Sequence, residues 1–289
     1  MLTTVFTAIL SAIHWHPDPV IFSIGSWSIR WYGLLYATAF ISCYYAFQEL
    51  TKRDNIPVER IDSLLIHMIL GTIIGARIGD CLFYNASYYL QHPIEILYIH
   101  RGGLSSHGGA CGILISLYIY ARKYKIDFIW VLDHIAIVVG LAGFFIRMGN
   151  LMNSEIYGIE TDLPWGFIFE RRGETLPKHP TMLYESFYYL ACYLLLRRIY
   201  RLKEDRPRPY FIFGLFLVMV FVFRVLVEFI KNPQEDFEAG MALNMGQLLS
   251  LPFIALGVWC LWKSRDTVWK PLPKSYLGLT RPKAEKKKK

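Results

Sequence analysis

Residues 128–158 read FIWVLDHIAIVVGLAGFFIRMGNLMNSEIYG, a long apolar run that ends in a cluster of polar side chains. The run over 128–149 has the length that a helix needs to cross the hydrocarbon core of a bilayer. Four hydrogen-bonding side chains stand at its end: Arg147, Asn150, Asn153 and Glu155. The stretch therefore predicts a transmembrane helix whose end carries a polar site.

Composition extends this prediction to the whole chain. Of the 289 residues, 54% are hydrophobic and 16% are aromatic, which is more apolar surface than one soluble core can bury. We expect an all-α polytopic bundle, with a single membrane domain over 1–263 and a basic cytoplasmic tail over 264–289. The predicted spans are 30–48, 62–84, 104–121, 128–149, 181–200, 209–230 and 245–263.

Glycines are concentrated in two of these spans, 62–84 and 104–121. Glycine lowers helix propensity, but inside a bilayer small residues let neighbouring helices approach closely. We retain both spans for this reason. The glycines concerned are Gly71, Gly75, Gly79, Gly108, Gly109 and Gly112.

Basic residues set the expected orientation. Of the 31 Lys and Arg residues, 22 lie in loops 49–61, 122–127 and 197–208 and in the tail from Lys263, whereas six lie in the opposite loops. By the positive-inside rule the tail is cytoplasmic and residues 1–29 face outward. The formal charge of +8 then serves cytoplasmic anchoring, and we expect no nucleic-acid partner.

Three arginines remain inside the predicted spans: Arg77, Arg147 and Arg224. A charge at the bilayer centre costs roughly 2.5–3.5 kcal/mol even on the gentler insertion scale. Each arginine lies in the outer half of its span, so that all three share one depth. Arg77 either snorkels to the interface or pairs with Asp80, whereas Arg147 and Arg224 have polar neighbours that favour a functional role.

Two further side chains at that depth are candidates with structural alternatives. Tyr32 is either a site residue or part of an aromatic belt at the membrane interface. His107 is flanked by glycines, which favour close approach of a ligand to the backbone, but a packed interfacial histidine is the alternative.

The same holds for three polar residues near the other spans. His179 precedes Pro180, so it is either a site residue or a cap of the next helix. Glu155 is either a site residue or only the partner of an arginine. Glu228 follows Arg224 by four residues, so the two side chains share a helix face and could pair.

Missing motifs exclude several classes of site. The five cysteines lie singly in apolar spans without a C-x-x-C pair, so we expect neither a disulfide framework nor a metal site. The sequence has no nucleotide-binding loop and no hydrolase or zinc-protease motif, and we expect no cofactor.

A layer of arginines suits the phosphate of a phospholipid, because the guanidinium fork matches phosphate oxygens. Charge placement alone does not separate reaction with a lipid from its transport.

The motif RMGNLMNSEIYG, together with WYG, HGG, HPTMLYE and FRVLVEF, resembles the bacterial prolipoprotein diacylglyceryl transferase family over about 18–252. Three residues depart from the family's pattern. Ile146 replaces a glycine, Leu151 replaces a phenylalanine, and Lys231 stands where arginine is common.

The resemblance implies a seven-helix transferase of the bacterial cytoplasmic (inner) membrane, with its active site facing the outer leaflet. Such enzymes transfer the diacylglyceryl group of phosphatidylglycerol to the lipobox cysteine of a prolipoprotein signal peptide. A thioether forms and glycerol phosphate is released. A phospholipid transporter or scramblase, or another phospholipid-dependent membrane transferase, is the alternative. A transporter predicts internal repeats, and the sequence has none.

The resemblance also implies site residues. It places eight on the family's functional positions: Tyr32, His107, Arg147, Asn150, Glu155, Gly158, Arg224 and Glu228. The sequence adds four substrate-binding candidates: Gly108, Gly109, Asn153 and His179. In the implied reaction the two arginines hold the phosphate, Tyr32 orients the head group or thiol, and His107 is the base or proton relay.

Overall fold

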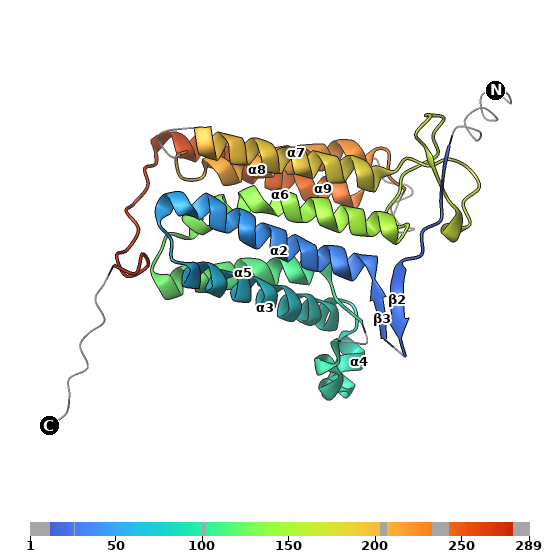
Figure 1. The fold of residues 1–289 in the computed structure, drawn as a ribbon, viewed down its shortest axis with the longest axis horizontal. Helices are drawn as coiled ribbons and strands as arrows, with labels where there is room; N and C mark the ends of the chain where they lie inside the picture. The colour runs from blue at the N-terminus through green and yellow to red at the C-terminus, as the bar shows by residue number, and fades with distance from the viewer. Residues whose placement is uncertain (1–11, 26, 100–101, 203–206, 233–242, 280–289) are drawn as a thin grey trace. The chain divides into compact units, whose positions relative to one another are not determined.

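The computed structural model describes residues 12–25, 27–99, 102–202, 207–232 and 243–279. These residues are mostly helical, which confirms the expected all-α class (Figure 1). The chain divides into two compact units. Unit 1 comprises residues 1–46 and 133–268, and unit 2 comprises residues 47–132 and 269–289.

A long helix occupies each of the seven predicted ranges, because each range is an apolar run bounded by loop residues. These helices are α2 (Trp31–Thr51), α3 (Val58–Phe83), α5 (Ser106–Tyr124), α6 (Phe128–Met152), α7 (Thr181–Leu202), α8 (Phe211–Glu228) and α9 (Met245–Lys263). The shorter helical elements are α4 (Ala86–Gln91) and four 3-10 turns, η1 (Lys52–Asp54), η2 (Pro93–Leu97), η4 (Glu170–Arg172) and η6 (Ser264–Asp266).

Among the described residues, four helical segments are long and apolar enough to cross a membrane, so the chain is a multi-pass membrane protein. They are α3, α6, α8 and Met245–Asp266, which includes α9. The helices α2, α5 and α7 carry more tyrosine, glycine or arginine, which lowers their hydropathy. That these three also cross the membrane, and that one domain spans 1–263, stay predictions.

In unit 1, contacts at both ends hold α8 and α9 in place. A Cβ atom at Gly214 would lie 2.9 Å from the backbone oxygen of Gly257, so the two helices pack backbone against backbone. Asn244 begins α9 with a capping box, in which its Oδ1 accepts from the Gln247 N–H at 2.9 Å. At the opposite end of α8, the Asp133 carboxylate accepts the N–H groups of Tyr210 and Phe213.

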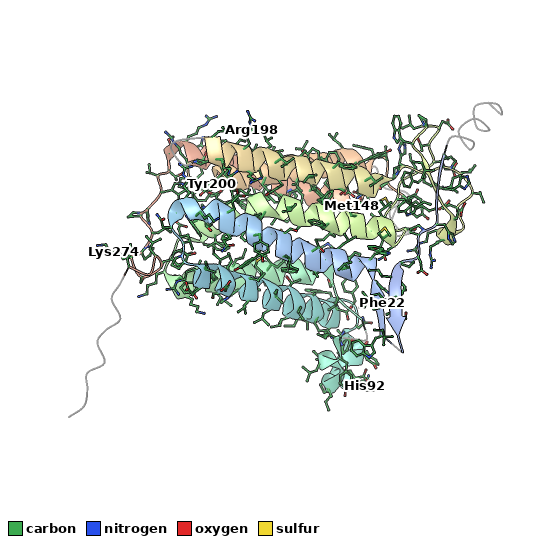
Figure 2. All side chains as sticks on the ribbon, viewed as in Figure 1. Phe22, His92, Met148, Arg198, Tyr200 and Lys274 are labelled. Carbon is green, nitrogen blue, oxygen red and sulfur yellow. The ribbon has the colours of Figure 1, made fainter. Side chains whose placement is uncertain are left out.

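The described part of unit 1 contains two small sheets. Strand β1 (Ile13–Trp15) pairs in parallel with β4 (Phe167–Phe169), and β2 (Val20–Ile24) forms an antiparallel hairpin with β3 (Trp27–Arg30) that leads into α2. Figure 2 shows Phe22 of this hairpin and Met148 of α6 toward one end of the unit 1 helices, and Tyr200 of α7 toward the other. The polar end of α6 thus lies at the end that carries the strands.

In unit 2, α3 and α5 lie side by side (Figure 1) and approach closely through glycines. A Cβ atom at Gly75 would lie 2.5 Å from the backbone oxygen of Gly108, and one at Gly71 would lie 2.7 Å from that of Gly112. No side chain fits between these backbones. The expected role of the glycines in helix packing is therefore confirmed.

The C-terminal segment also packs in unit 2. Tyr276 is 1% exposed, and its hydroxyl lies 2.9 Å from that of Tyr120. The Arg60 guanidinium donates to the backbone oxygens of Ser275 and Tyr276. Residues 269–279 therefore pack against the helices of unit 2. The lysine-rich end over 280–289 lies outside the described residues.

Candidate functional site

Arg147, near the end of α6, belongs to a buried ionic network in unit 1. Its Nη2 donates to Glu185 Oε1 at 3.1 Å, and its Nη1 donates to Asn150 Oδ1 at 3.3 Å. Glu185 comes from α7, and its side chain is 0% exposed. The guanidinium fork is thereby fixed on two sides, which favours a defined orientation.

Lys231, which follows α8, joins the same network. Its Nζ donates to Glu185 Oε1 at 2.9 Å and lies 3.5 Å from Glu228 Oε2. Burial lowers the pKa of Lys231, although the carboxylates of Glu185 and Glu228 oppose the shift. One carboxylate oxygen of Glu185 is thus shared between two cations, Arg147 and Lys231.

The loop after α6 is built around Glu155. The Nδ2 groups of Asn150 and Asn153 donate to Glu155 Oε1 at 2.8 and 3.2 Å. Arg172 also holds the loop, by donating to the backbone oxygens of Asn153 and Ser154. Both asparagine amides keep a second N–H, which could donate to a ligand.

Gly158 connects three parts of unit 1 through its backbone. Its N–H donates to the His179 carbonyl at 2.8 Å, and it forms a bridge with Lys231. A Cβ atom at Gly158 would lie 2.8 Å from the Cβ of His179, which leaves no room for a side chain. Gly158 thus ties the loop after α6 to the segment that carries Lys231.

His179 stands at the start of α7, where it is half-buried. Its Nδ1 lies 3.3 Å from the Tyr184 hydroxyl. Burial lowers the pKa of His179, so that the neutral imidazole is favoured near neutral pH.

Tyr32, in the first turn of α2, packs on α6. A Cβ atom at Gly149 would lie 2.8 Å from the Tyr32 ring, so the glycine makes room for it. Tyr32 also interacts electrostatically with Glu155 and Arg147. Within unit 1 the structure therefore brings Tyr32, the α6 end and the Glu155 loop together.

Arg224, on α8, is half-buried and forms no hydrogen bond or ion pair with any described residue. Tyr189 of α7 interacts electrostatically with both Arg224 and Arg147. Arg224 and Glu228, which could pair by their spacing, do not pair in the structure. Glu228 instead lies against Gly246 and pairs with Lys231, three positions further along the chain.

The other three candidates, His107, Gly108 and Gly109, belong to unit 2. His107 is exposed in the first turn of α5, which Ser105 caps by accepting the Gly108 N–H. Gly108 is buried, and a Cβ atom there would lie 2.7 Å from Gly79 Cα. Packing against α3 therefore accounts for Gly108, and a substrate-binding role for it and Gly109 stays a prediction.

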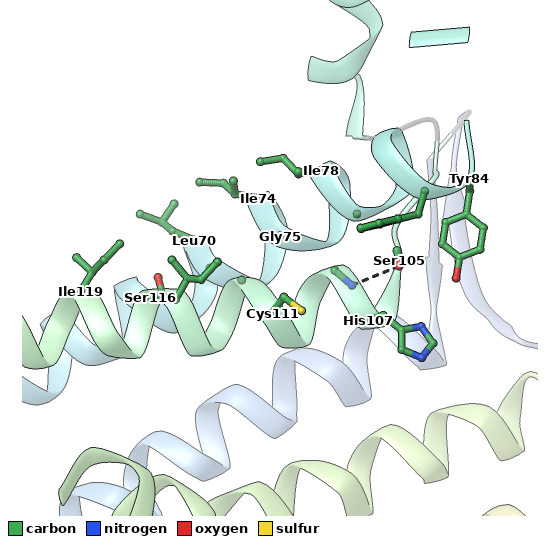
Figure 3. Close-up of a pocket in the computed structure, with 16 residues that line it drawn as sticks. Leu70, Ile74, Gly75, Ile78, Tyr84, Ser105, His107, Cys111, Ser116 and Ile119 are labelled. Carbon is green, nitrogen blue, oxygen red and sulfur yellow. Dashed lines mark hydrogen bonds between the residues drawn. The ribbon is translucent and has the colours of Figure 1, made fainter. Parts of the chain in front are cut away.

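His107 lines an apolar groove of about 720 Å³ between α3 and α5. Figure 3 shows His107 and Tyr84 at one end of the groove and Ile119 at the other. Leu70, Ile74 and Ile78 of α3 form much of its wall. His107 thus lies where an apolar surface meets a polar helix start.

Sequence reasoning placed Glu185 at the level of the arginines without naming a partner for it, and gave no site role to Tyr189 or Lys231. Glu185 lies in the HPTMLYE motif, but a single glutamate has no visible partner in a sequence. The sequence marks Lys231 only as a departure from an arginine, whereas in the structure its side chain is 1% exposed and lies between two carboxylates. A lysine at the end of an apolar span is itself a signal, because burial of that charge requires a partner.

Comparisons with known proteins agree with the sequence motifs. The family model described as prolipoprotein diacylglyceryl transferase matches residues 19–263. The chain is 42% identical over 247 residues, 85% of this chain and 95% of the relative, to a Tolumonas auensis protein. It is 40% identical over 263 residues, 87% of this chain and 95% of the relative, to a Bacteroides fragilis protein. Both relatives are named phosphatidylglycerol–prolipoprotein diacylglyceryl transferase. The chain therefore belongs to the prolipoprotein diacylglyceryl transferase family.

Proposed function

We propose that the protein transfers the diacylglyceryl group of phosphatidylglycerol to the cysteine thiol of prolipoprotein signal peptides, the first step of lipoprotein maturation. The motifs and the names of its relatives support this activity. The same relatives disfavour a phospholipid transporter or scramblase, since they are named as transferases.

The observation that carries the proposal is the state of the two arginines in unit 1. Arg147 is oriented by Glu185 and Asn150, whereas Arg224 has no hydrogen-bond partner within the described ranges. A half-buried guanidinium without a partner is costly unless a ligand neutralises it. An anionic phosphate fits this requirement, because it accepts bidentate hydrogen bonds from arginine.

The reaction balances as a substitution at carbon. The cysteine sulfur attacks the glyceryl carbon that carries the phosphate ester, a C–S bond forms and the C–O bond breaks. The electron pair of that bond leaves with the phosphate oxygen of glycerol phosphate. Arg147 and Arg224 would stabilise the negative charge that develops there, which is the effect of preorganised donors in a poorly hydrated site.

The thiol must lose its proton before or during attack, since its reference pKa is near 8.5. We assign His107 as the base or proton relay, and Tyr32 as the residue that orients the head group or thiol. The second N–H groups of Asn150 and Asn153 would donate to glyceryl or phosphate oxygens. Glu155, which accepts from both amides, would fix their orientation.

The remaining candidates have supporting roles. Gly158 would hold the loop after α6 against Lys231, and His179 would bound the same loop. Glu228 would balance the charge of Lys231. We place the enzyme in the bacterial inner membrane, with its active site toward the outer leaflet, because the basic loops are expected on the cytoplasmic side.

A peptide assay tests the proposal. Purified protein is incubated with phosphatidylglycerol labelled in its acyl chains and with a lipobox peptide, and labelled peptide is measured. A matched peptide with serine in place of cysteine is the control. We expect label only on the cysteine peptide, and a loss of at least about tenfold in Arg224→Gln. Equal labelling of both peptides, or none of either, would contradict the proposal.

A further inference from the structure

The inference concerns Lys231 and rests on the proposed function. Its ammonium group is one of four buried charges in unit 1. The other three belong to Arg147, Glu185 and Glu228. The exposed fractions of these three side chains are 13%, 0% and 5%, respectively, and that of Lys231 is 1%. Two positive and two negative charges are thus largely shielded from solvent. Because water and salt ions have little access to them, their interactions are weakly screened.

Glu185 is the shared member of this group. Its Oε1 accepts from Arg147 Nη2 at 3.1 Å and from Lys231 Nζ at 2.9 Å. Its Oε2 is buried and accepts no hydrogen bond from the described residues. Lys231 thus takes part of a carboxylate charge that would otherwise act on Arg147 alone.

Removal of the Lys231 charge would change this group of four side chains from neutral to net negative. Of the four side chains, two carboxylates (Glu185 and Glu228) and one cation (Arg147) would then remain charged. The phosphate of a phospholipid would meet a net negative group there, and like charges in a poorly hydrated site repel strongly. Lys231 cannot replace Arg147 as a phosphate ligand, because its ammonium is almost fully buried.

We propose that Lys231 is a positioning residue, which shares Glu185 with Arg147 and thereby leaves the Arg147 guanidinium oriented and positive for the lipid phosphate. Lys231 acts through Glu185 and touches no substrate. The backbone bridge between Lys231 and Gly158 keeps the lysine at the loop that follows Arg147.

A double-mutant cycle tests this role. Lys231→Met keeps most of the apolar stem and removes the charge. We expect the KM for phosphatidylglycerol to rise about tenfold or more, and the equilibrium affinity of the purified protein for phosphatidylglycerol to fall similarly. Lys231→Arg keeps the charge and should stay within about threefold of the unmodified protein.

The second arm measures Glu185→Gln alone and together with Lys231→Met, which completes the cycle. The glutamine oxygen can still accept from Arg147 Nη2, but the uncompensated negative charge is gone. We expect the double variant to recover most of the lost affinity. If Lys231 bound the lipid phosphate itself, the double variant would be as weak as Lys231→Met, and the proposal would be wrong.

Lys178→Met is the matched control. Lys178 also bridges two glutamates, Glu160 at 3.1 Å and Glu174 at 3.3 Å, but outside the Arg147 network. We expect its KM to be unchanged. If Lys231→Met lowers only the amount of folded protein and leaves KM and lipid affinity unaltered, Lys231 is purely structural and the inference fails.

Lipid binding separates this inference from the proposed function. If the unmodified protein binds phosphatidylglycerol but transfers nothing to the peptide, the proposed function fails. The coupling between Lys231 and Glu185 can still be calculated in that case, from the lipid affinities of the variants. If transfer occurs and the cycle shows no coupling between Lys231 and Glu185, the inference alone fails.

Discussion

Arg147 is the residue at the polar end of α6 whose hydrogen-bond geometry best suits binding of a phosphate. Its fork divides between Asn150 on its own helix and Glu185 on α7. Only a planar guanidinium makes both contacts and still presents further N–H groups to a phosphate. The charge of Arg147 is therefore less important than the directions of its donors.

Arg147→Lys should lose most transfer activity although it keeps the positive charge. We expect kcat/KM for phosphatidylglycerol to fall about tenfold or more, because the ammonium cannot span both partners and bind bidentately. Arg198→Lys, on the exposed face of α7, is the control and should be unchanged. Normal turnover of Arg147→Lys would contradict this account, because it would show that only the positive charge at this position matters and not the geometry of the guanidinium.

His107→Gln tests the assignment of the base. We expect a rate loss of about 10²-fold at neutral pH if histidine moves the proton. A pH–rate profile with saturating phosphatidylglycerol gives the reason for the loss. Recovery at high pH, where the thiol ionises by itself, indicates deprotonation by His107. A loss that is flat across pH indicates binding or architecture, and no loss would remove His107 from the mechanism.

The local part of the site could be predicted from the sequence, and the long-range part could not. Arg147, Asn150 and Glu155 stand within nine residues, so one helix end brings them together. The contact between Lys231 and Glu185 joins residues 46 positions apart, and no periodicity points to it. The spacing of Arg224 and Glu228 allows them to pair, but Glu228 pairs instead with Lys231, whose side chain is more deeply buried than that of Arg224.

At the scale of elements, α3 and α5 depend on the absence of side chains at their crossing. Gly75→Ala should lower the free energy of unfolding by about 1–3 kcal/mol, the usual cost of overpacking. Its Cβ would lie 2.5 Å from the Gly108 carbonyl oxygen, and backbone cannot easily yield. Gly33→Ala, whose Cβ would meet nothing within 4 Å, is the control. Thermal unfolding in detergent measures both, and equal midpoints would contradict the packing account.

Arg77 holds the loop that precedes α5. Its guanidinium donates to the carbonyls of Glu95, Ile96, Gly102 and Gly103, and it lies 3.8 Å from Asp80. The expected alternative of a pair with Asp80 is thus present, but the carbonyl contacts are shorter. Arg77 therefore has a structural role that the sequence could not reveal, because carbonyl groups carry no sequence signal.

Arg77→Met should loosen this loop. We expect faster proteolysis within 93–99 and 102–105, since four carbonyls lose their shared donor. Arg77→Lys should be intermediate, and its turnover should fall less than that of Arg147→Lys. Unchanged cleavage in Arg77→Met would show that the loop is held by other contacts.

At the scale of the whole molecule, composition was enough to predict an all-α membrane protein. The apolar runs fixed the approximate helix ranges, because a bilayer demands long uninterrupted helices. The parallel pairing of β1 with β4 could not be predicted, because it joins three-residue strands more than 150 positions apart. The docking of Tyr276 was missed for the same reason, since nothing in a basic tail marks one buried tyrosine.

Orientation is the prediction that belongs to this scale. A reporter fused after Lys263 should read cytoplasmic, and one inserted in the 159–175 loop should read extracytoplasmic. The reason is the division of 22 against six Lys and Arg residues between the two sets of loops. A reporter after Lys263 that reads extracytoplasmic would reverse the topology and remove the outer-leaflet site.

The most direct measurement of the central claim follows two labels in one phosphatidylglycerol molecule, one in the glyceryl backbone that bears the acyl chains and one in the head-group glycerol. After incubation with a lipobox peptide, the account predicts the backbone label on the cysteine through a thioether, and the head-group label in released glycerol phosphate. Both labels on the peptide would show phosphatidyl transfer, and a peptide that gains acyl mass but carries neither label would show acyl transfer. Either result would contradict diacylglyceryl transfer by this protein.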